Sequence, residues 1–423
     1  MLLQFSVANH LSIRDRQVIS LTASSLLDEE ESLIDCPVAP NGKVVPAAII
    51  YGANASGKSN VVAALRYMRS AVLKSHSQGE PSGGVPRSPF SLDPTCAEAP
   101  SIFDVDFVLD KLRFHYGFEV TDDAFTAEWL YAFPNGRRQK LFHRVNSNVK
   151  FGRSLKGRNS VIADLMRPNS LYLSVAAQND HEQLSKIFEL FYSINIDEKI
   201  SIGGQLASLR LYKGDIDNRI IDFLSDIGTG VFSYQKKEEE FPERVLEMFK
   251  GFGAVMKQFT GEELNQSDLP NKKYTIELGH RGKGGEVVYF DLDKESAGTR
   301  RLLVMLSLIF RALDKGTLLV VDELDASLHT KACEALLALF CSRSTNPNGA
   351  QLIGTTHDTN LLRAPFLRRD QVWFAEKDAT GATHLFPLTD IRTRKGDNLA
   401  KGYLQGRFGG MPSGGPSTHF SVD

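Results

Sequence analysis

Hydrophobic and polar residues alternate along the first third of the chain with the two-residue period of β-strands. Alternation over residues 3–7 and 18–21 predicts two strands, and the continuous apolar run Ala47–Tyr51 predicts a buried strand that ends in a glycine-rich turn. Between Ile102 and Val145, short alternating runs are separated by turn residues, which is typical of antiparallel hairpins. We therefore expect an antiparallel β-lobe over residues 100–150.

Apolar residues then recur with the helical period of 3.6 residues from Ser160 to Gln258. This pattern predicts a helical lobe inserted over residues 155–275. The helices expected within it cover Gln183–Tyr192, Ile216–Ile227 and Glu243–Lys257.

The last third of the chain alternates predicted strands with predicted helices, which is typical of a parallel α/β sheet. We predict an α/β fold in one body over residues 1–423, with a core from 1–95 and 286–400 and a flexible Gly/Pro/Ser-rich tail over 410–423. Helices are expected at Gly298–Leu313 and Ser327–Phe340, and strands at Val287–Leu292, Leu318–Val321, Leu352–Thr355, Val372–Ala375 and His384–Leu388.

The composition excludes several classes of protein. A formal net charge of −2 gives the whole chain no attraction to nucleic acid or anionic membranes, so such binding would need a local patch. The four cysteines form no C-x-x-C pair and lie near no histidine at metal-ligand spacing, which argues against a zinc site or a disulfide framework. The cysteine pattern fits a reducing cytoplasm, which is the expected location. Because no apolar run reaches the roughly 18 residues of a membrane span, we expect no membrane partners.

The segment Gly52–Ser59 matches the pattern G-x-x-x-x-G-K-[ST] at every fixed position, between the predicted strand and a helix that should begin at Lys58. Glycines let the backbone wrap around a phosphate chain, which N–H groups and the helix N-terminus stabilise. We expect Lys58 to contact the β- and γ-phosphates and Ser59 to bind Mg²⁺. The residues predicted to bind ATP are Gly52, Asn54, Ser56, Gly57, Lys58, Ser59 and Asn60.

The apolar strand Leu318–Val321 ends in the acidic pair Asp322-Glu323, at the edge where parallel sheets bind their ligands. Such a pair after a buried strand is the Walker B arrangement. Asp322 can hold Mg²⁺ together with Ser59, and Glu323 can orient or deprotonate the attacking water. ATP and Mg²⁺ are therefore the expected cofactors.

Three further segments resemble motifs of ABC, SMC and RecF-like ATPases by their order and spacing. Residues 324–329 resemble the D-loop that follows Walker B, and residues 295–300 resemble a degenerate ABC signature that would receive the γ-phosphate of a partner subunit's nucleotide. The same signature residues also fit an ordinary helix N-cap, so both interpretations stay open. His357 matches the H-loop histidine that senses the γ-phosphate. The expected members are Asp325 and Ser327 in the D-loop, Ser296, Gly298 and Thr299 in the signature, and Lys58, Glu323 and His357 as catalytic residues.

Together with the turn Asn9–Ser12 and the closing segment Tyr403–Pro412, these motifs resemble the short ABC-type AAA ATPases of prokaryotic antiphage systems. The RloA and AriA types are examples, and the heads of OLD, RecF and SMC proteins are related. The resemblance implies an ABC-type P-loop ATPase head that forms a homodimer or a higher oligomer around ATP. It also implies a separately encoded effector, commonly a TOPRIM or other nuclease, because no cluster of nuclease-type residues follows His357.

Two other functions stay open. A RecF-like DNA-binding ATPase is compatible with the basic stretch 137–158, which contains no acidic residue; a solvated hairpin edge explains the same charges. The candidate nucleic-acid or partner patch is Arg137, Arg138, Lys140 and Arg144. The second alternative is a scaffold locked by ATP without hydrolysis. Glu323 argues against the scaffold, while the degenerate signature and the absence of an assignable Q-loop glutamine favour slow turnover.

Overall fold

The computed structural model describes residues 1–26, 28, 30–196, 215–240, 244, 247–248, 251, 272–394 and 396–410. We predicted one body, whereas the chain forms two compact units. The first unit comprises Met1–Glu198, Arg311–Ala326 and Cys333–Asp423, and the second comprises Lys199–Phe310 and Ser327–Ala332.

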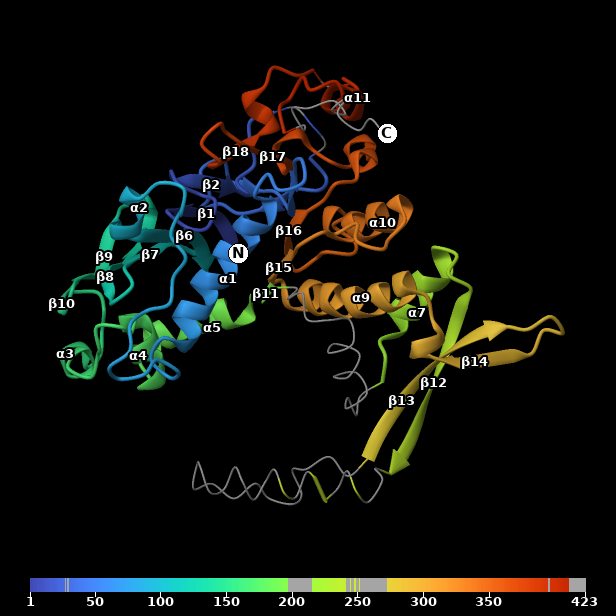
Figure 1. Cartoon of the computed structure of the whole chain (residues 1–423), viewed down its shortest axis with the longest axis horizontal. Helices are drawn as coiled ribbons and strands as arrows, with labels where there is room; N and C mark the ends of the chain where they lie inside the picture. Colours follow the sequence, from blue (N-terminus) through green and yellow to red (C-terminus); the bar gives the residue numbers. More distant parts are fainter. Residues whose placement is uncertain are drawn as a thin grey trace, which may run out of the picture. The chain divides into compact units, whose positions relative to one another are not determined.

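A six-stranded sheet in the order β11-β15-β16-β5-β17-β18 forms the α/β part of the first unit (Figure 1). All neighbouring pairs are parallel except β17 with β18. The central strands are buried on both faces, as expected for a parallel sheet covered by helices. The strands are β5 (Ala47–Tyr51), β11 (Asn195–Ile196), β15 (Leu318–Val321), β16 (Gln351–Thr355), β17 (Val372–Lys377) and β18 (Thr383–Pro387).

A seven-stranded antiparallel sheet in the order β10-β9-β8-β7-β6-β1-β2 forms the predicted β-lobe. The lobe also includes the first two strands of the chain, which we had assigned to the α/β core, because β1 pairs with β6. Its strands are β1 (Leu2–Ala8), β2 (Gln17–Ser20), β6 (Ser101–Leu109), β7 (Leu112–Val120), β8 (Phe125–Ala132), β9 (Gln139–Val145) and β10 (Asn148–Phe151).

One hydrophobic core joins the two sheets of the first unit. Apolar side chains from the inner face of the β-lobe pack with β5, β15 and three helices. These helices contact one another beside the sheet (Figure 1). They are α1 (Lys58–Lys74), α4 (Tyr172–Gln178) and α5 (Glu182–Ser193). The remaining elements of this unit include β3 (Ile34–Asp35), β4 (Lys43–Val44), α2 (Thr95–Glu98), α3 (Asn159–Ala163) and α11 (Leu399–Leu404).

The helical insertion predicted over residues 155–275 is divided, because α3, α4 and α5 belong to the first unit. The second unit is not purely helical. It contains α7 (Asn218–Asp226) near the expected helix, but residues 231–240 and 272–281 form the strands β12 (Val231–Glu240) and β13 (Lys272–Arg281). They build a three-stranded antiparallel sheet with β14 (Val287–Asp291). The helix expected at Glu243–Lys257 and the tail after Gly410 lie almost wholly outside the described residues.

Two helices run from one unit into the other in sequence. The helix α9 (Ala297–Lys315) begins in the second unit and leads to β15, and α10 (Thr330–Cys341) follows the segment after Walker B. Both were predicted to within three residues at each end. The α/β fold class with an antiparallel lobe is thus confirmed.

Candidate functional site

The phosphate-loop segment Gly52–Ser59 connects β5 to α1, and its glycines are required by close packing. A Cβ atom on Gly57 would overlap the side chain of Thr383, and Gly57 has a left-handed φ of 102°. A Cβ atom on Gly52 would overlap the carbonyl oxygen of Ala375. The loop is therefore enclosed by β17 and β18, which supply these two neighbours.

Lys58 lies at the centre of this loop, with its side chain buried. Its ammonium group donates hydrogen bonds to the carbonyl oxygens of Gly52 at 2.8 Å and Ala53 at 2.9 Å. Burial lowers the pKa of Lys58, while the nearby carboxylates of Asp322, Asp325 and Glu323 act in the opposite direction. The loop thus holds a cation against the acidic end of β15.

The Walker B aspartate faces the first turn of α1. The Ser59 hydroxyl donates to Oδ1 of Asp322 at 3.1 Å, and the Thr355 hydroxyl donates to the same oxygen at 2.7 Å. These groups come from three strand ends, because β16 lies between β5 and β15 in the sheet. The topology therefore brings together residues that are about 260 positions apart.

Ser59 and Asp322 fit a Mg²⁺ ion chemically, since both offer hard oxygen ligands. The described residues contain no group of three or more His, Cys, Asp or Glu side chains that could hold a metal by themselves. A magnesium ion here would accordingly need phosphate oxygens and water to complete its octahedral shell, which is its usual arrangement with nucleotides.

Glu323 is held in an unusual backbone conformation beside this aspartate. Its φ angle is 56°, in the left-handed region that few non-glycine residues adopt. Its N–H group donates to the Thr355 hydroxyl at 2.7 Å, and the next N–H group, of Leu324, donates to the Thr355 carbonyl at 2.8 Å. Thr355, which we did not single out from the sequence, therefore fixes both acidic residues. The signal that could have identified it is its position at the end of a strand beside Walker B.

His357 is exposed just beyond β16, in the same unit. Its N–H group donates to the carboxylate of Asp325 at 3.2 and 3.3 Å, which ties the predicted H-loop to the predicted D-loop. The two segments thus lie together at the ends of β15 and β16.

The signature residues lie together with part of the D-loop in the second unit. The Ser296 hydroxyl accepts a hydrogen bond from the Thr299 N–H at 3.0 Å, which is N-cap geometry. A Cβ atom built on Gly298 would lie 2.8 Å from the carbonyl oxygen of Ser327, so this glycine permits close approach of the D-loop. His280 on β13 contacts Glu295, directly before Ser296, at 2.8 Å. The N-cap interpretation is borne out, and it is compatible with the signature interpretation.

Other predicted ATP-binding side chains face different neighbours. Asn60 donates to the Ser12 hydroxyl at 2.5 Å, and Ser12 is hydrogen-bonded to Thr383 at 2.7 Å. Thr383 in turn donates to the carbonyl oxygen of Ser56 at 3.0 Å. The N-terminal turn that we associated with the family resemblance is thus part of the support of the loop. Asn54 is exposed at its tip.

The basic patch requires one correction. Arg137, Arg138 and Lys140 are exposed near the start of β9, whereas Arg144 is fully buried. Its guanidinium group lies 3.8 Å from Glu128 and donates to the carbonyl oxygens of Pro168 and Ser170. Arg144 is therefore a core residue of the β-lobe and cannot contact nucleic acid.

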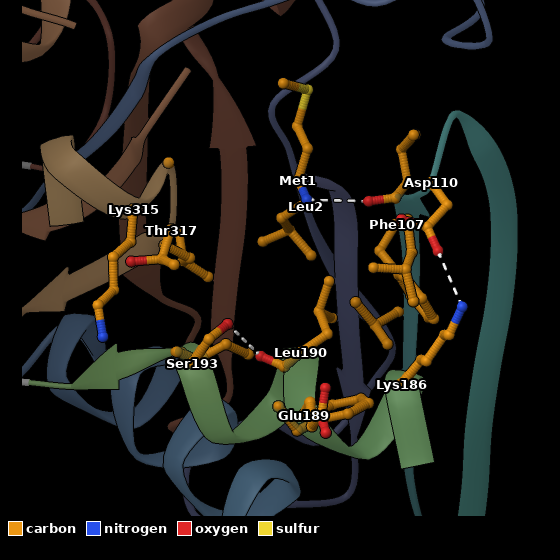
Figure 2. A pocket seen from close by; sticks show the side chains of 17 residues that line it. Met1, Leu2, Phe107, Asp110, Lys186, Glu189, Leu190, Ser193, Lys315 and Thr317 are labelled. Atoms are coloured by element: carbon orange, nitrogen blue, oxygen red, sulfur yellow. Dashed lines mark hydrogen bonds and ion pairs between the residues drawn. The ribbon is translucent and has the colours of Figure 1, made fainter. Parts of the chain in front are cut away.

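A cavity of about 530 Å³ in the first unit has a lining that includes Met1, Lys186 and Thr317 (Figure 2). An ion pair between Lys186 and Asp110, 3.8 Å apart, borders the cavity. The Met1 amino group donates a hydrogen bond to the carbonyl oxygen of Val108 at 3.0 Å. Burial lowers the pKa of that amino group to about 6. The lining includes none of the phosphate-loop or Walker B residues, so we assign the cavity no part in the nucleotide site.

Within the ranges that the structure describes, no helix is both long and apolar enough to cross a membrane.

Comparison with solved structures finds similarity to SMC heads at low sequence identity. A crystal structure of the SmcHead bound to the C-winged helix domain of ScpA matches with a TM-score of 0.40 and 15% identity, over 91% of this chain and 96% of that chain. A Smc head domain with an extended coiled coil, bound to the C-terminal domain of ScpA derived from Pyrococcus furiosus, matches with a TM-score of 0.39 and 14% identity, over 92% and 97%. No curated protein matches the chain in sequence.

Comparison with protein families gives a match over residues 47–363, which include the phosphate loop, the signature segment, Walker B and His357. The matching family is described as "AAA domain, putative AbiEii toxin, Type IV TA system". Because the match covers well over half of the 423 residues, the chain belongs to this family of AAA domains.

Proposed function

We propose that the chain binds ATP with Mg²⁺ and hydrolyses it slowly. The hydrogen-bonded cluster of Ser59, Asp322, Thr355 and Glu323 carries this proposal, because it joins the phosphate loop to the acidic end of β15. A Mg²⁺ ion would supply charge neutralisation for the phosphates when bound. Lys58 would bind the β- and γ-phosphates, and Glu323 would orient and deprotonate a water molecule.

The proposed catalytic unit is a homodimer or a higher oligomer, in which the signature of one subunit contacts the nucleotide of the other. This proposal is supported by the N-terminus of α9, where Ser296 and the small residue Gly298 leave backbone N–H groups near the helix end. The positive end of a helix 19 residues long is suited to a terminal phosphate. Turnover that rises more steeply than linearly with protein concentration would support the shared site.

We further propose that ATP switches a separately encoded effector in prokaryotic antiphage defence, with a TOPRIM or other nuclease as the effector class. The family description, which names a toxin of a toxin–antitoxin system, and the resemblance to RloA and AriA types support this role. Co-purification of the product of a neighbouring open reading frame, dependent on ATP, would test it. Failure of every neighbouring product to bind would argue against the switch.

Two variants test ATP binding and hydrolysis separately. Lys58→Ala should abolish binding of a fluorescent ATP analogue, because it removes the buried cation from the loop. Glu323→Gln should retain binding, lower phosphate release by about 10²- to 10⁴-fold, and accumulate an ATP-bound oligomer on size exclusion. Equal nucleotide affinity in Lys58→Ala and the wild type would reject the site. Equal, measurable phosphate release in Glu323→Gln and the wild type would reject Glu323 as the base, whereas ATP binding without phosphate release in the wild type would favour the non-hydrolysing scaffold.

A RecF-like DNA-binding ATPase is the second candidate, because cations and aromatic rings occur together on the β-lobe. The guanidinium of exposed Arg138 lies 3.8 Å from the ring centre of Tyr131. The His115 ring is roughly parallel to the rings of Tyr131 and Trp129, with its centroid 6.3 Å from each. Such surfaces contact phosphates and bases. Duplex DNA affinity that falls with salt and is lost in an Arg137→Ala, Arg138→Ala, Lys140→Ala triple variant would favour this candidate.

A further inference from the structure

The segment near the end of the chain, for which the sequence offered no mechanism, folds into a compact hook. Helix α11 begins after Asn398, whose side-chain oxygen accepts from the Lys401 N–H at 2.9 Å. The chain then reverses at Gly406, which has a φ of 72°, and the Arg407 N–H donates to the Gly402 carbonyl at 3.0 Å. We call residues 398–410 the C-terminal hook.

Aromatic contacts attach the hook to β17 and to β5, the strand from which the phosphate loop starts. The ring of Tyr403 stacks on Phe374 of β17 with a centroid distance of 5.4 Å and an interplanar angle of 14°. It also meets Tyr51, the last residue of β5, at 6.1 Å in an edge-on arrangement. Phe408 packs on the same Phe374 ring at 5.9 Å, and both hook aromatics are at least 95% buried.

The hook ends directly on the phosphate loop. The Gly410 carbonyl accepts a hydrogen bond from the Ala53 N–H at 2.7 Å, and the hydroxyl of Tyr403 donates to the same carbonyl at 3.1 Å. The Gly410 N–H donates to Oε2 of Glu376 at 3.1 Å. A Cβ atom built on Gly410 would lie 3.6 Å from the Cα atom of Gly52, so the hook reaches the first two residues of the loop.

The N–H and carbonyl groups of Ala53 are thereby both hydrogen-bonded, one to the hook and one within the loop. Its N–H group is held by Gly410 of the hook, and its carbonyl accepts from the ammonium of Lys58 at 2.9 Å. Gly409 and Gly410 have φ angles of 72° and 68°, which other residues adopt only with strain. A Cβ on Gly409 would also lie 2.6 Å from the Glu376 carboxylate. The Gly-Gly pair is therefore suited to this docked position.

We propose that the C-terminal hook is a working part of the nucleotide site: Glu376, Tyr403 and Gly410 position Ala53, and through it the phosphate loop and Lys58. This inference rests on the proposed ATP binding and adds a positioning element outside the known motifs. Coupling between two events is reciprocal, so ATP binding must stabilise the docked hook as much as the docked hook favours ATP binding. A partner that captures the hook would thereby lower ATP affinity.

Substitutions that remove one hook contact test the positioning role. Glu376→Ala and Tyr403→Phe each remove a partner of Gly410 and should weaken binding of a fluorescent ATP analogue by about threefold to tenfold. Glu376→Gln should restore affinity, because its amide oxygen still accepts from the Gly410 N–H. Gln405→Ala changes an exposed residue of the same hook and is the matched control. Thermal unfolding without nucleotide should be similar in Tyr403→Phe, Glu376→Gln and the control.

Hydrogen exchange in the full-length protein provides a second readout that a purely structural role would not change. Amides of the hook should exchange more slowly after ATP is added to the wild type, and at an unchanged rate after ATP is added to Lys58→Ala. The inference alone is overturned, and the proposed function stands, if the wild type binds ATP without any change in hook exchange and if Glu376→Ala and Tyr403→Phe bind ATP as tightly as Gln405→Ala. If the wild type binds no ATP, the proposed function fails and the inference fails with it.

Discussion

Replacing Thr355 with valine removes one hydroxyl group that makes two hydrogen bonds in the Walker B region while keeping the shape of the side chain. The hydroxyl donates to the Asp322 carboxylate at 2.7 Å and accepts from the Glu323 N–H at 2.7 Å. A hydrogen bond to a charged group contributes about 1.5–3 kcal/mol and a neutral one about 0.5–1.5 kcal/mol. The two bonds together therefore contribute about 2–4.5 kcal/mol.

The lower part of that range applies here, because Asp322 keeps the bond from Ser59 at 3.1 Å. If about 2 kcal/mol is lost where the metal ligand and the base must be aligned, ATP turnover falls about 30-fold. Phosphate release measured against Mg²⁺ concentration should show the lower rate and a higher Mg²⁺ requirement, with ATP binding retained. Thr355→Ser keeps the hydroxyl and should recover most of the turnover.

The matched control is Thr126→Val on β8, whose buried hydroxyl has no hydrogen-bond partner within the described residues. The same chemical change there should leave turnover unaltered. Wild-type turnover and wild-type Mg²⁺ dependence in Thr355→Val would refute the argument that this hydroxyl aligns the acidic pair.

Two further predictions concern the stability of the β-lobe and the neighbouring turn. Arg144→Met should lower the free energy of unfolding by about 3–5 kcal/mol, because it leaves Glu128 buried without its cation. The exposed control Arg137→Ala should change this free energy by less than about 0.5 kcal/mol. Equal urea midpoints for the two variants would contradict the assignment of Arg144 to the core. Burial lowers the pKa of His10 from 6.5 to about 4, so its neutral form contributes stability above pH 6.5 that is lost as the pH falls towards 4. The free energy of unfolding of the wild type, followed by thermal unfolding, should therefore fall by at most about 3 kcal/mol over this pH range. This fall should be absent in His10→Phe. Parallel pH profiles of the two proteins would exclude the effect.

The edge of the sheet that carries the candidate site was predictable because its signals are local. A buried apolar run followed by a fixed-position motif placed β5, the start of α1 and β15 at the observed residues. The burial of Arg144 also had a local signal that we did not use. Phe142 is apolar and two positions before Arg144 on β9, so the strand period directs both side chains to the same, inner face.

Of the three strands of the second unit, only β14 was predicted, as the strand Val287–Leu292, whereas β12 and β13 could not be predicted in the same way. β12 contains the charged run Lys236–Glu240, which lacks the alternation of apolar and polar residues that indicates a strand. Its pairing is stabilised by residues of β13 that lie about 40 positions away. Lys237 pairs with Glu277 at 2.8 Å, and the ammonium of Lys236 lies 4.3 Å from the ring centre of Tyr274. A sequence window does not contain such cross-strand partners.

At the candidate site, too, the contacts that hold the phosphate loop could not be predicted from the sequence. Glycines give the loop its close approach to phosphate, but they provide no side chains that could fix its shape. That shape is held from outside, by Thr383 on Ser56, by Ser12 through Asn60, and by Gly410 on Ala53. These neighbours come from both ends of the chain, and none of them belongs to the phosphate-loop or Walker B motif. The sequence pattern therefore predicts which groups meet the phosphates, whereas the affinity of the loop depends on contacts that only the folded chain brings together.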